Sequence, residues 1–504
     1  MSNFFKRHHH LLSILVPIVI GLIFITISSL NLVSSIWFDE AYSAYLVRGN
    51  FVDIWQLTAV DVHPPLFYFC LKIWSILFGT TDFALRFMSV FFGLIAIIFA
   101  FQLIKRWFSL PAATIATFIM SISPMFIRYA QEMRMYTLLL AIVFSATFFL
   151  NLALDTKKRI YWITYGILVS LGMWTHYFSA LVWLAHLVFI LHYFGGLRKF
   201  FAAKSPLLAY LLSVLLFLPW LPAFIKQTAS VQGGFWIPEV SLATPLSLLS
   251  EALLFQEKPA EVKSWLVALI VALLSLFIFF ILKAKKQLNS KQTLHHQLIF
   301  AMVLLPPIFL IILSLPPLRP IFVNRYVSYS TISLWLLFGL IITAIYSMKL
   351  AHPLFRHGLV ATVLLTAALG IINVQTRQPS GFVKDAILPI YQLGQDHQPI
   401  LAGDDWIYYD AVFYSSERHP VYFFESWTDY RWSSLEPIRR YRHNLITDLP
   451  AFLSQHHSFW YLVNTPKDGT EPKLPSEITP HFYIKNKVVN PHHTSLELER
   501  ISNN

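Results

Sequence analysis

The sequence is poor in charged residues and has almost no cysteine. Only 13% of its 504 residues are Asp, Glu, Lys or Arg, about half the share found in soluble domains. The single cysteine, Cys70, excludes an intramolecular disulfide and a thiolate metal cluster. Its position in an apolar run favours a small buried thiol. The composition is therefore not that of a soluble or a disulfide-stabilised protein.

Several motifs of soluble enzymes are also missing. The sequence has no Gly-x-x-x-x-Gly-Lys phosphate loop, no Gly-x-Gly-x-x-Gly fingerprint and no Gly-x-Ser-x-Gly turn. No Asp-x-Asp pair lies in a predicted cytoplasmic domain, where it would hold the metal of a nucleotide sugar. These absences disfavour a soluble nucleotide donor, and a lipid-borne donor fits better.

Long apolar runs are abundant, since 56% of the residues are hydrophobic. Runs of about 20 residues predict an all-α polytopic membrane protein. The first run has no small-residue cleavage site, so we interpret it as a retained span. The eleven predicted spans are 11–30, 84–104, 111–127, 135–153, 160–176, 179–195, 206–225, 264–282, 297–315, 327–347 and 356–375.

The distribution of basic residues predicts the orientation of these spans in the membrane. The net charge is +12, but no basic stripe with interleaved aromatic residues indicates nucleic-acid binding. With the N-terminus inside, every short cytoplasmic loop contains Lys or Arg, as the positive-inside rule requires. Eleven spans then leave the C-terminal tail outside, in a plasma-membrane topology. The basic residues of these loops and of the N-terminus are Lys6, Arg7, Lys105, Arg106, Lys157, Lys158, Arg159, Arg198, Lys199, Lys204, Lys283, Lys285, Lys286, Lys291 and Lys349.

The chain divides into a membrane domain, 1–375, and an extracytoplasmic domain, 376–504. The short apolar stretch Pro64–Phe78 is expected to lie at the outer interface with its prolines in the first helical turn. It belongs to one outer loop of juxtamembrane helices, 36–83, which carries the candidate active site. The tail is expected to be a small α/β domain, with strands at 399–402, 420–424 and 458–463 and helices at 385–395 and 433–455.

Two carboxylates, Asp39 and Glu40, follow the first predicted span closely. Acidic groups at a bilayer edge are costly unless they have a function, although a solvated loop pair is the simpler alternative. Trp37, Phe38 and Tyr42 surround the pair with aromatic surface, as does Tyr45 further along. Partial desolvation would raise the pKa of a carboxylate and make it a better proton acceptor near neutral pH.

A second polar segment, Asp61-Val62-His63-Pro64-Pro65-Leu66, lies in the same loop. Capping of a helix that starts at the prolines is the structural alternative for Asp61 and His63. A third group is basic and falls on the predicted outer face, where each member could instead be a snorkelling side chain. Fixed cations there suit a lipid phosphate. The members of this group are Arg86, Arg128, Arg134 and Arg325.

The order Asp39-Glu40, Asp-x-His-Pro-Pro-Leu and Arg86 resembles the protein O-mannosyltransferases. More broadly, it resembles the GT-C glycosyltransferases of family 39, relatives of the lipid A aminoarabinose transferases. The segments Thr175-His176-Tyr177-Phe178 and Asn324-Arg325-Tyr326 also resemble bacterial members. The likeness extends over residues 1–350 and is poor in the tail, which does not resemble the β-trefoil insert of eukaryotic protein mannosyltransferases.

The resemblance implies a polyprenyl-phosphate sugar as donor and an extracytoplasmic hydroxyl or amine as acceptor. Asp39 would be the catalytic base, with Glu40 beside it and Asp61 in the second acidic motif. Arg86, His63, Arg128 and Arg325 would bind the donor phosphate. Displacement with one base and no covalent intermediate would invert the anomeric centre. A divalent metal could also bind near Asp61 and His63.

Two other classes of protein remain open from the sequence. A lipid or solute transporter could line a pathway with His176 and the arginines, but the charges gather at one face and no internal repeat is visible. A non-catalytic envelope protein could use its outer domain for binding, which leaves the acidic loop without a role.

Overall fold

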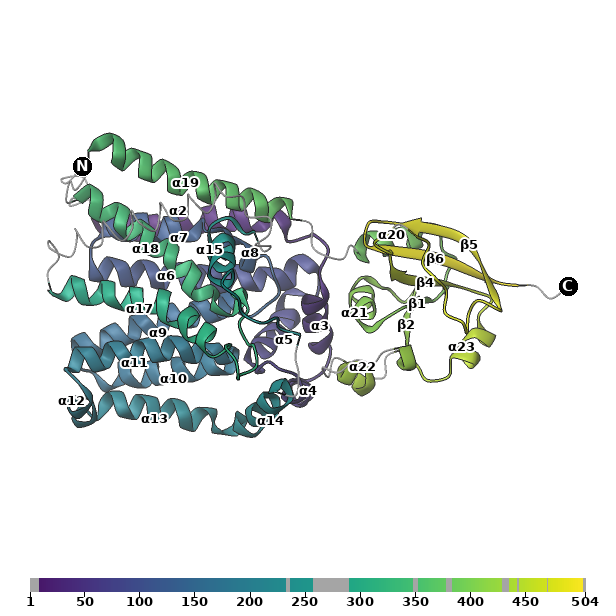
Figure 1. Cartoon of the computed structure of the whole chain (residues 1–504), viewed down its shortest axis with the longest axis horizontal. Coiled ribbons are helices and arrows are strands. Elements are labelled where there is room, and N and C mark those ends of the chain that lie inside the picture. The colour runs from purple at the N-terminus through teal and green to yellow at the C-terminus, as the bar shows by residue number, and fades with distance from the viewer. Residues whose placement is uncertain are drawn as a thin grey trace. The chain divides into compact units, whose positions relative to one another are not determined.

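The computed structural model describes residues 9–232, 236–256, 290–347, 352–377, 383–427, 435–441, 444–468 and 470–501. The chain forms two compact units (Figure 1). The helical unit comprises Met1–Leu32, Val62–Phe67 and Arg86–Arg377, and the α/β unit comprises Val33–Asp61, Tyr68–Leu85 and Gln378–Asn504. Each unit is described by itself.

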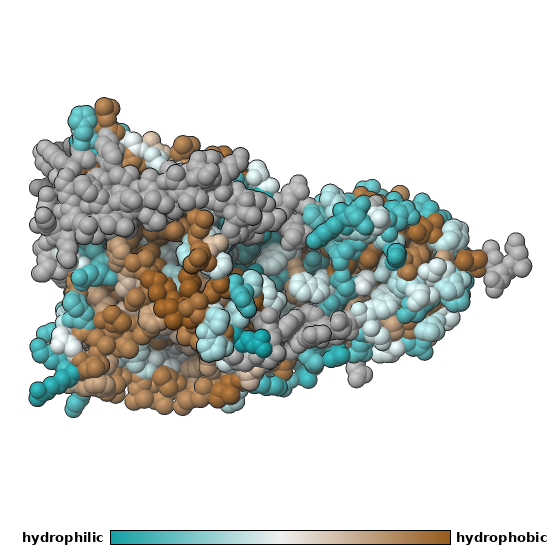
Figure 2. All heavy atoms as spheres, in the orientation of Figure 1, coloured by the Kyte–Doolittle hydropathy of each residue, from teal (hydrophilic) through white to brown (hydrophobic). Residues whose placement is uncertain are grey.

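The helical unit is a bundle of long apolar helices. Brown, hydrophobic side chains cover much of the visible bundle surface in Figure 2, as expected for helices that face lipid. Its elements are α2 (His9–Ser28), η1 (Ser29–Asn31), most of α6 (Asp82–Trp107), α7 (Leu110–Ser121), α8 (Pro124–Ala130), α9 (Tyr136–Thr156), α10 (Arg159–Thr175), η2 (Tyr177–Ser179), α11 (Ala180–Phe194), α12 (Leu197–Ala202), α13 (Ser205–Phe217), η3 (Leu218–Trp220), α14 (Leu221–Gln232), α15 (Thr244–Leu254), α17 (Ser290–Ile312), η5 (Asn324–Val327), α18 (Ser328–Ser347) and α19 (Pro353–Thr376).

Eight described helical segments are long and apolar enough to span a membrane, or nine if one bent pair counts as a span. This confirms a polytopic helical membrane protein. The predicted span 160–176 lies on α10, which has 17 residues and is not among the eight. The predicted span 264–282 lies outside the described residues.

The predicted span 111–127 is not one continuous helix. The structure divides this segment into α7 and α8, which are bent by 63° at the break. Pro124 occupies the first turn of α8. Proline lacks an N–H and disfavours helical conformation in the residue before it, which accounts for the break between α7 and α8.

A buried polar chain joins four helices inside the bundle. The Thr147 hydroxyl lies 3.1 Å from His186 Nε2, and the Tyr165 hydroxyl lies 3.2 Å from His186 Nδ1. The Tyr165 hydroxyl also lies 2.9 Å from the hydroxyl of Tyr210. Because unpaired polar groups are costly in an apolar interior, these contacts fix the packing of α9, α10, α11 and α13.

The α/β unit combines most of the predicted outer loop with the C-terminal segment. Its elements are α3 (Phe38–Leu46), α4 (Phe51–Val60), most of α5 (Leu66–Phe78), α20 (Val383–Leu393), β1 (Ile400–Ala402), α21 (Asp405–Tyr414), β2 (Val421–Phe424), η6 (Glu425–Trp427), α22 (Leu435–Tyr441), β3 (Leu445–Ile446), α23 (Leu449–Gln455), β4 (Ser458–Asn464), β5 (Phe482–Val489) and β6 (His493–Arg500).

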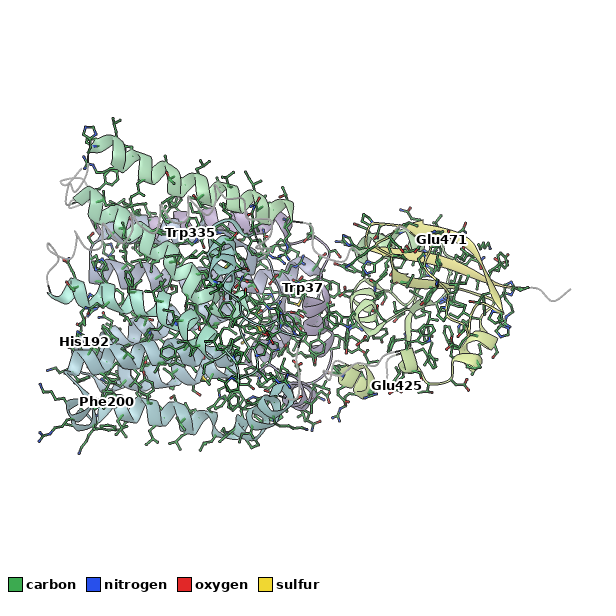
Figure 3. The ribbon with its side chains drawn as sticks, viewed as in Figure 1. Trp37, His192, Phe200, Trp335, Glu425 and Glu471 are labelled. Atoms are coloured by element: carbon green, nitrogen blue, oxygen red, sulfur yellow. The ribbon has the colours of Figure 1, made fainter. Side chains whose placement is uncertain are left out.

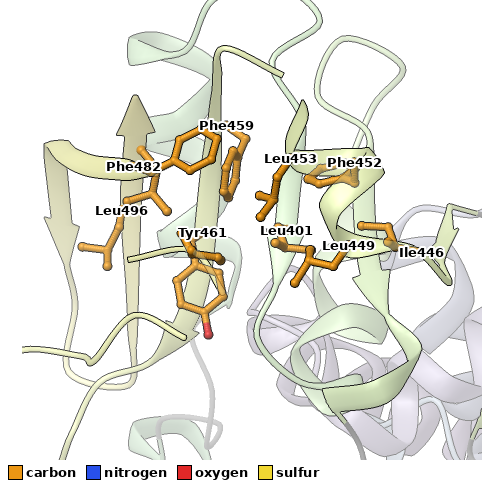
Figure 4. Close-up of a cluster of buried hydrophobic side chains, with 11 residues drawn as sticks. Leu401, Ile446, Leu449, Phe452, Leu453, Phe459, Tyr461, Phe482 and Leu496 are labelled. Carbon is orange, nitrogen blue, oxygen red and sulfur yellow. The ribbon is translucent and has the colours of Figure 1, made fainter. Parts of the chain in front are cut away.

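The six strands form one mixed sheet in the order β3-β2-β1-β4-β6-β5. The first four strands in this order are parallel, and β6 pairs antiparallel with both β4 and β5. The register places Leu401 beside Tyr461 and Tyr461 opposite Leu496. These three side chains point to the same face of the sheet and join the buried cluster drawn in Figure 4.

The two faces of the sheet are covered by different helices. On the face with Leu496, α23 supplies Leu449, Phe452 and Leu453 to the buried cluster (Figure 4). Successive side chains of a strand alternate between faces, and the neighbouring Ser495 hydroxyl donates to the carbonyl of Ala386 in α20 at 2.9 Å. The helix α20 therefore covers the opposite face.

The sequence predictions for this unit are partly confirmed. The three predicted strands correspond to β1, β2 and β4, and the first predicted helix corresponds to α20. The predicted helix 433–455 is wrong, because α22 and α23 are separated by β3. The expectation that Pro64 and Pro65 lie in the first turn of α5 is also wrong, since α5 begins at Leu66. The predicted domain division at residue 375 stays a prediction.

Candidate active site

The Asp39-Glu40 motif lies at the start of a short helix. Trp37, labelled in Figure 3, precedes α3, and both carboxylates lie in its first turn. Negative charge is favoured there by the free N–H groups and the helix dipole. Glu40 is fully buried, and its Oε2 accepts a hydrogen bond from the Trp37 N–H at 3.4 Å. Glu40 is therefore not a solvated loop residue.

Aromatic side chains pack α3 against α21 within the α/β unit. The rings of Phe38 and Trp406 stack with centroids 4.2 Å apart. Tyr409 makes edge contacts with Tyr42 at 5.5 Å and with Tyr45 at 5.0 Å. The aromatic surroundings predicted for the acidic pair thus include a helix of the C-terminal segment, which was not foreseen.

A third carboxyl, Asp410, lies in this interface. It is 6% exposed, and Glu40, Asp404 and Asp39 are its electrostatic neighbours. Burial, reinforced by these neighbouring carboxylates, raises the pKa of Asp410 well above its usual value. The surroundings of Asp410 therefore favour the protonated form of this carboxyl.

Asp61 ends a helix instead of starting one. It is the C-terminal cap of α4, and its N–H donates to the carbonyls of Leu57 and Thr58 at 3.2 Å. Its extended backbone leads into Pro64-Pro65, and α5 begins only at Leu66. The helix-start interpretation of Asp61 is therefore wrong. Its role in the second acidic motif stays a prediction.

The remaining predicted site residues belong to the helical unit, where His63 joins a polar cluster. Arg134 Nη2 lies 3.5 Å from His63 Nε2, and the ring of His176 lies 6.2 Å from the ring of His63. Tyr326 packs on His176 with centroids 5.2 Å apart. Arg134 and His176 are 3% and 4% exposed, so these two members of the cluster are buried.

Arg325 lies beside this cluster, in η5. Its guanidinium lies 5.4 Å from the ring centroid of Trp236 and 6.0 Å from that of Tyr326, in cation–π geometry. The preceding residue, Asn324, donates to Glu251 Oε2 at 2.7 Å. Glu251 lies on α15. The Nε1–H of Trp335, labelled in Figure 3, donates to the carbonyl of the neighbouring Ala252 at 2.8 Å and so fixes this helix.

Arg128 has a different environment. It forms an ion pair with Glu132 one turn later, and its guanidinium lies 6.0 Å from the Phe255 ring. The next residue, Tyr129, donates to Glu251 Oε1 at 3.4 Å. Glu251 therefore connects the segment of Arg128 to that of Arg325, although Arg128 itself is already paired with a carboxylate.

Arg86 is buried in α6, with 2% of its surface exposed. Its Nη1 donates to the carbonyl of Leu32 at 3.0 Å, just after η1. Carbonyls at a helix end lack intrahelical partners, so Arg86 satisfies one of them. This contact gives Arg86 a structural role that the sequence did not suggest. Donor binding by Arg86 stays a prediction.

A cavity of about 330 Å³ opens beside the His63 cluster. His63, His176 and Tyr326 lie in its wall, together with Tyr177 and Gln227, and most of the other lining side chains are apolar. Ligand pockets of this kind combine apolar walls with a few polar groups that orient the ligand. The mostly apolar lining suits a ligand with an apolar part better than a free ion.

No group of three or more His, Cys, Asp or Glu side chains within the described ranges is arranged to hold a metal ion. Asp61 and His63, the predicted metal ligands, belong to different units.

The sequence interpretation underestimated several residues of these two clusters. The sequence places Arg134 in the basic group of the outer face and His176 in a family-like segment without assigning either to the site, and it does not single out Asp410 or Glu251. The sequence could have indicated Glu251, because a lone carboxylate in an apolar helix is costly and is usually functional. It holds no such indication for Asp410, since its importance depends on the packing of α21 against α3.

Comparison with known proteins agrees with this architecture. Residues 62–222 match the family model described as dolichyl-phosphate-mannose-protein mannosyltransferase. None of the curated proteins compared with the sequence matches it. ArnT from Cupriavidus metallidurans bound to undecaprenyl phosphate has a similar structure, with a TM-score of 0.62, 13% identity and coverage of 97% of each chain. Its apo form gives a TM-score of 0.60 at 12% identity and covers 98% of each chain.

A more distant likeness supports the same fold. The apo oligosaccharyltransferase of Archaeoglobus fulgidus gives a TM-score of 0.52 at 13% identity, covering 92% of this chain and 70% of the other. The similarity to ArnT extends over both the helical and the α/β parts of the chain. The chain therefore has the ArnT fold, and its residues 62–222 are similar to the dolichyl-phosphate-mannose-protein mannosyltransferases.

Proposed function

We propose that the protein is a membrane glycosyltransferase that uses a polyprenyl-phosphate sugar. The observation that carries this proposal is the likeness of nearly the whole chain to an ArnT that binds undecaprenyl phosphate. The family match over residues 62–222 supports the same donor class. The acceptor is an extracytoplasmic protein, lipid or envelope glycan, and the protein is a multi-pass protein of the plasma membrane.

In the proposed reaction, Asp39 acts as the general base. The acceptor hydroxyl or amine attacks the anomeric carbon while its proton passes to the Asp39 carboxylate. A new bond forms at the anomeric carbon, the bond to the phosphate oxygen breaks, and the polyprenyl phosphate leaves with the electron pair. One displacement inverts the anomeric centre. Glu40, held by the Trp37 N–H, fixes the first turn of α3.

The leaving phosphate needs fixed positive charge or hydrogen-bond donors. His63 and Arg325 are the best supported of the predicted phosphate ligands, because both belong to the polar cluster of His176 and Tyr326 beside the cavity. Arg134 joins them through His63. Arg128 and Arg86 remain in the proposal with weaker support. Arg128 already forms an ion pair with Glu132, and Arg86 already donates to the carbonyl of Leu32.

Transfer of label tests the function directly. Purified protein is incubated with radiolabelled undecaprenyl-phosphate sugars and an envelope extract, and the labelled fraction is identified. We expect label to move from the lipid to one envelope fraction when the parent protein is present. No label should move when the protein is left out. Movement of intact labelled lipid across proteoliposome membranes, without cleavage of the sugar, would instead support a flippase and contradict the proposal.

A further inference from the structure

The helix α21 carries a buried carboxyl that the proposed reaction does not use. Asp410 is 6% exposed, and among the described residues its Oδ1 has no hydrogen-bond partner. Ionised carboxylates are rarely buried without a partner. A group placed in this way must either stay neutral or have a function that offsets its cost.

Asp410 lies on the face of α21 that packs against α3. Trp406, Tyr409 and Asp410 share one helical face, because side chains three and four residues apart lie one above the other. The first two contact α3 through Phe38 at 4.2 Å and Tyr42 at 5.5 Å. The carboxyl of Asp410 therefore lies on the side of α21 that faces α3, the helix whose first turn contains Asp39 and Glu40.

Few groups in the described part of the chain could neutralise a charge at this position. The nearest cation on α20, Lys384, is bonded to Asp82 at 3.0 Å, and Arg48 donates to the carbonyl of Val412 at 3.2 Å. The groups that act electrostatically on Asp410 are all carboxylates. The titratable residues of the elements packed against α21 are Asp39, Glu40, Tyr42 and Tyr45 on α3, Lys384, Asp385 and Tyr391 on α20, Tyr422 on β2 and Tyr461 on β4.

We propose that Asp410, buried where α21 packs against α3, is a positioning residue that holds the first turn of α3 and thereby the Asp39 carboxylate against α21. The inference rests on the proposed function, in which Asp39 is the base. A neutral carboxyl can be buried beside Glu40, whereas two adjacent buried carboxylates repel each other. Ionisation of Asp410, as the pH rises through its folded pKa, would therefore loosen the contact of α21 with α3 and displace Asp39.

Two substitutions separate the shape of this side chain from its charge. Asp410→Asn keeps the size and stays neutral at every pH, so transfer near neutral pH should remain within about threefold of the parent. A decrease in rate that the parent shows as Asp410 ionises should be absent in this variant. Asp410→Ala removes the carboxyl from this interface, and kcat should fall by about 10²-fold, as expected for a misplaced catalytic group. The KM for the undecaprenyl-phosphate sugar should change by less than about threefold.

Hydrogen exchange gives a readout that does not require activity. In the full-length protein in detergent, Asp410→Ala should accelerate amide exchange over Phe38–Leu46, and Asp410→Asn should not. Glu497→Gln is the matched control, because Glu497 is a buried carboxyl of the same unit, 2% exposed, that accepts from Gln398 at 3.1 Å. It should leave both α3 exchange and kcat unchanged.

Each outcome decides the inference. Parental kcat and parental α3 exchange in Asp410→Ala would overturn it. Equal loss of kcat in Asp410→Asn and Asp410→Ala, with unchanged α3 exchange, would show that the proton itself is used in the chemistry and would also overturn it. If the parent transfers no sugar at all, the proposed function fails. The exchange measurement then still decides whether Asp410 holds α3.

Discussion

The main-chain N–H of Ile36 donates a hydrogen bond of 2.8 Å to the hydroxyl of Tyr414, which lies 378 residues later in the chain. Two further bonds act in the same way within the α/β unit. Arg48 Nη2 donates to the carbonyl of Val412 at 3.2 Å, and Lys384 Nζ forms an ion pair with Asp82 at 3.0 Å. The segment after the first span is therefore folded onto the C-terminal segment. This packing explains how a helix of nine residues, α3, can hold a carboxylate in a fixed place, since isolated helices of this length are unstable.

The first prediction concerns the proposed base. Asp39→Asn is almost isosteric but cannot accept the proton of the acceptor. We expect the transfer rate to fall by roughly 10²–10⁴-fold, the usual contribution of general-base catalysis. Binding of undecaprenyl phosphate should change far less, because the substitution leaves the His63 cluster intact. Radiolabel transfer and lipid binding measure the two effects separately.

Asp396→Asn is the control for this experiment. Asp396 is an exposed carboxylate of the same unit that pairs with Arg418 on the surface, and exposed pairs of this kind contribute little to stability. The control should transfer sugar at the parental rate. If Asp39→Asn also does so, Asp39 is a structural residue of the α3 first turn and another group must act as the base.

The second prediction concerns stability and pH. Desolvation and nearby carboxylates raise the pKa of Asp410 in the folded protein, whereas an unfolded Asp ionises near pH 4. Above about pH 4 the unfolded state releases a proton that the folded state keeps. The stability contribution of this group is therefore fully present below the unfolded pKa and decreases as the pH rises toward the folded pKa.

Asp410→Asn removes this titration. The Tm of the variant should exceed that of the parent, and the difference should increase as the pH rises from about 4 toward the folded pKa. Thermal unfolding of the full-length protein at several pH values measures the effect, with Glu497→Gln as the reference for loss of a buried carboxyl. A Tm difference that does not change with pH would mean that Asp410 is already ionised in the folded protein.

The sequence alone predicted the parts of this fold that depend on local pattern. Apolar runs identified the membrane helices, and alternating or apolar stretches identified β1, β2 and β4. The bend between α7 and α8 could have been read from Pro124. The strand β5 was missed because most of its side chains are exposed at the edge of the sheet, with lysines at 485 and 487, so it lacks the alternation of a half-buried strand.

The candidate site was predictable only in part, for a physical reason. Asp39, Glu40 and His63 could be found because carboxylates and imidazoles are unusual next to membrane spans. Asp410 and Arg134 depend on contacts between segments far apart in the chain. Contacts between distant segments cannot be predicted from the local pattern of a single sequence. The structural contact of Arg86 with Leu32 has the same origin.

The third prediction concerns the orientation in the membrane, which we propose from the loop charges. Asp39, Asp61, Arg128 and the tail after Thr376 should all face the outside. Single cysteines at these positions, in a Cys70→Ser background, should react with an impermeant reagent added to intact cells. A cysteine at Lys157 should react only after the membrane is permeabilised. Labelling of position 39 from the cytoplasmic side would contradict the proposed mechanism.

The last prediction separates two roles of Arg86. As a phosphate ligand, its guanidinium would bind two oxygens at once, which lysine cannot do. Arg86→Lys should then weaken binding of undecaprenyl phosphate clearly, and Arg86→Ala should nearly abolish transfer, with a Tm close to that of the parent. As a cap of the helix end at Leu32, Arg86 contributes to folding instead, because it satisfies a buried carbonyl at 3.0 Å.

In that second case Arg86→Ala should lower the Tm, and Arg86→Lys should restore much of it, because an ammonium can also donate to a carbonyl. Lipid binding by the folded fraction would then be unchanged in both variants. Arg325→Lys is the matched comparison, since Arg325 lies beside Tyr326 in the cavity wall and makes no such bond to Leu32. Lipid binding and Tm measured on all three variants distinguish the roles: parental lipid binding together with a lowered Tm in Arg86→Ala would remove Arg86 from the donor site and leave the phosphate to His63 and Arg325.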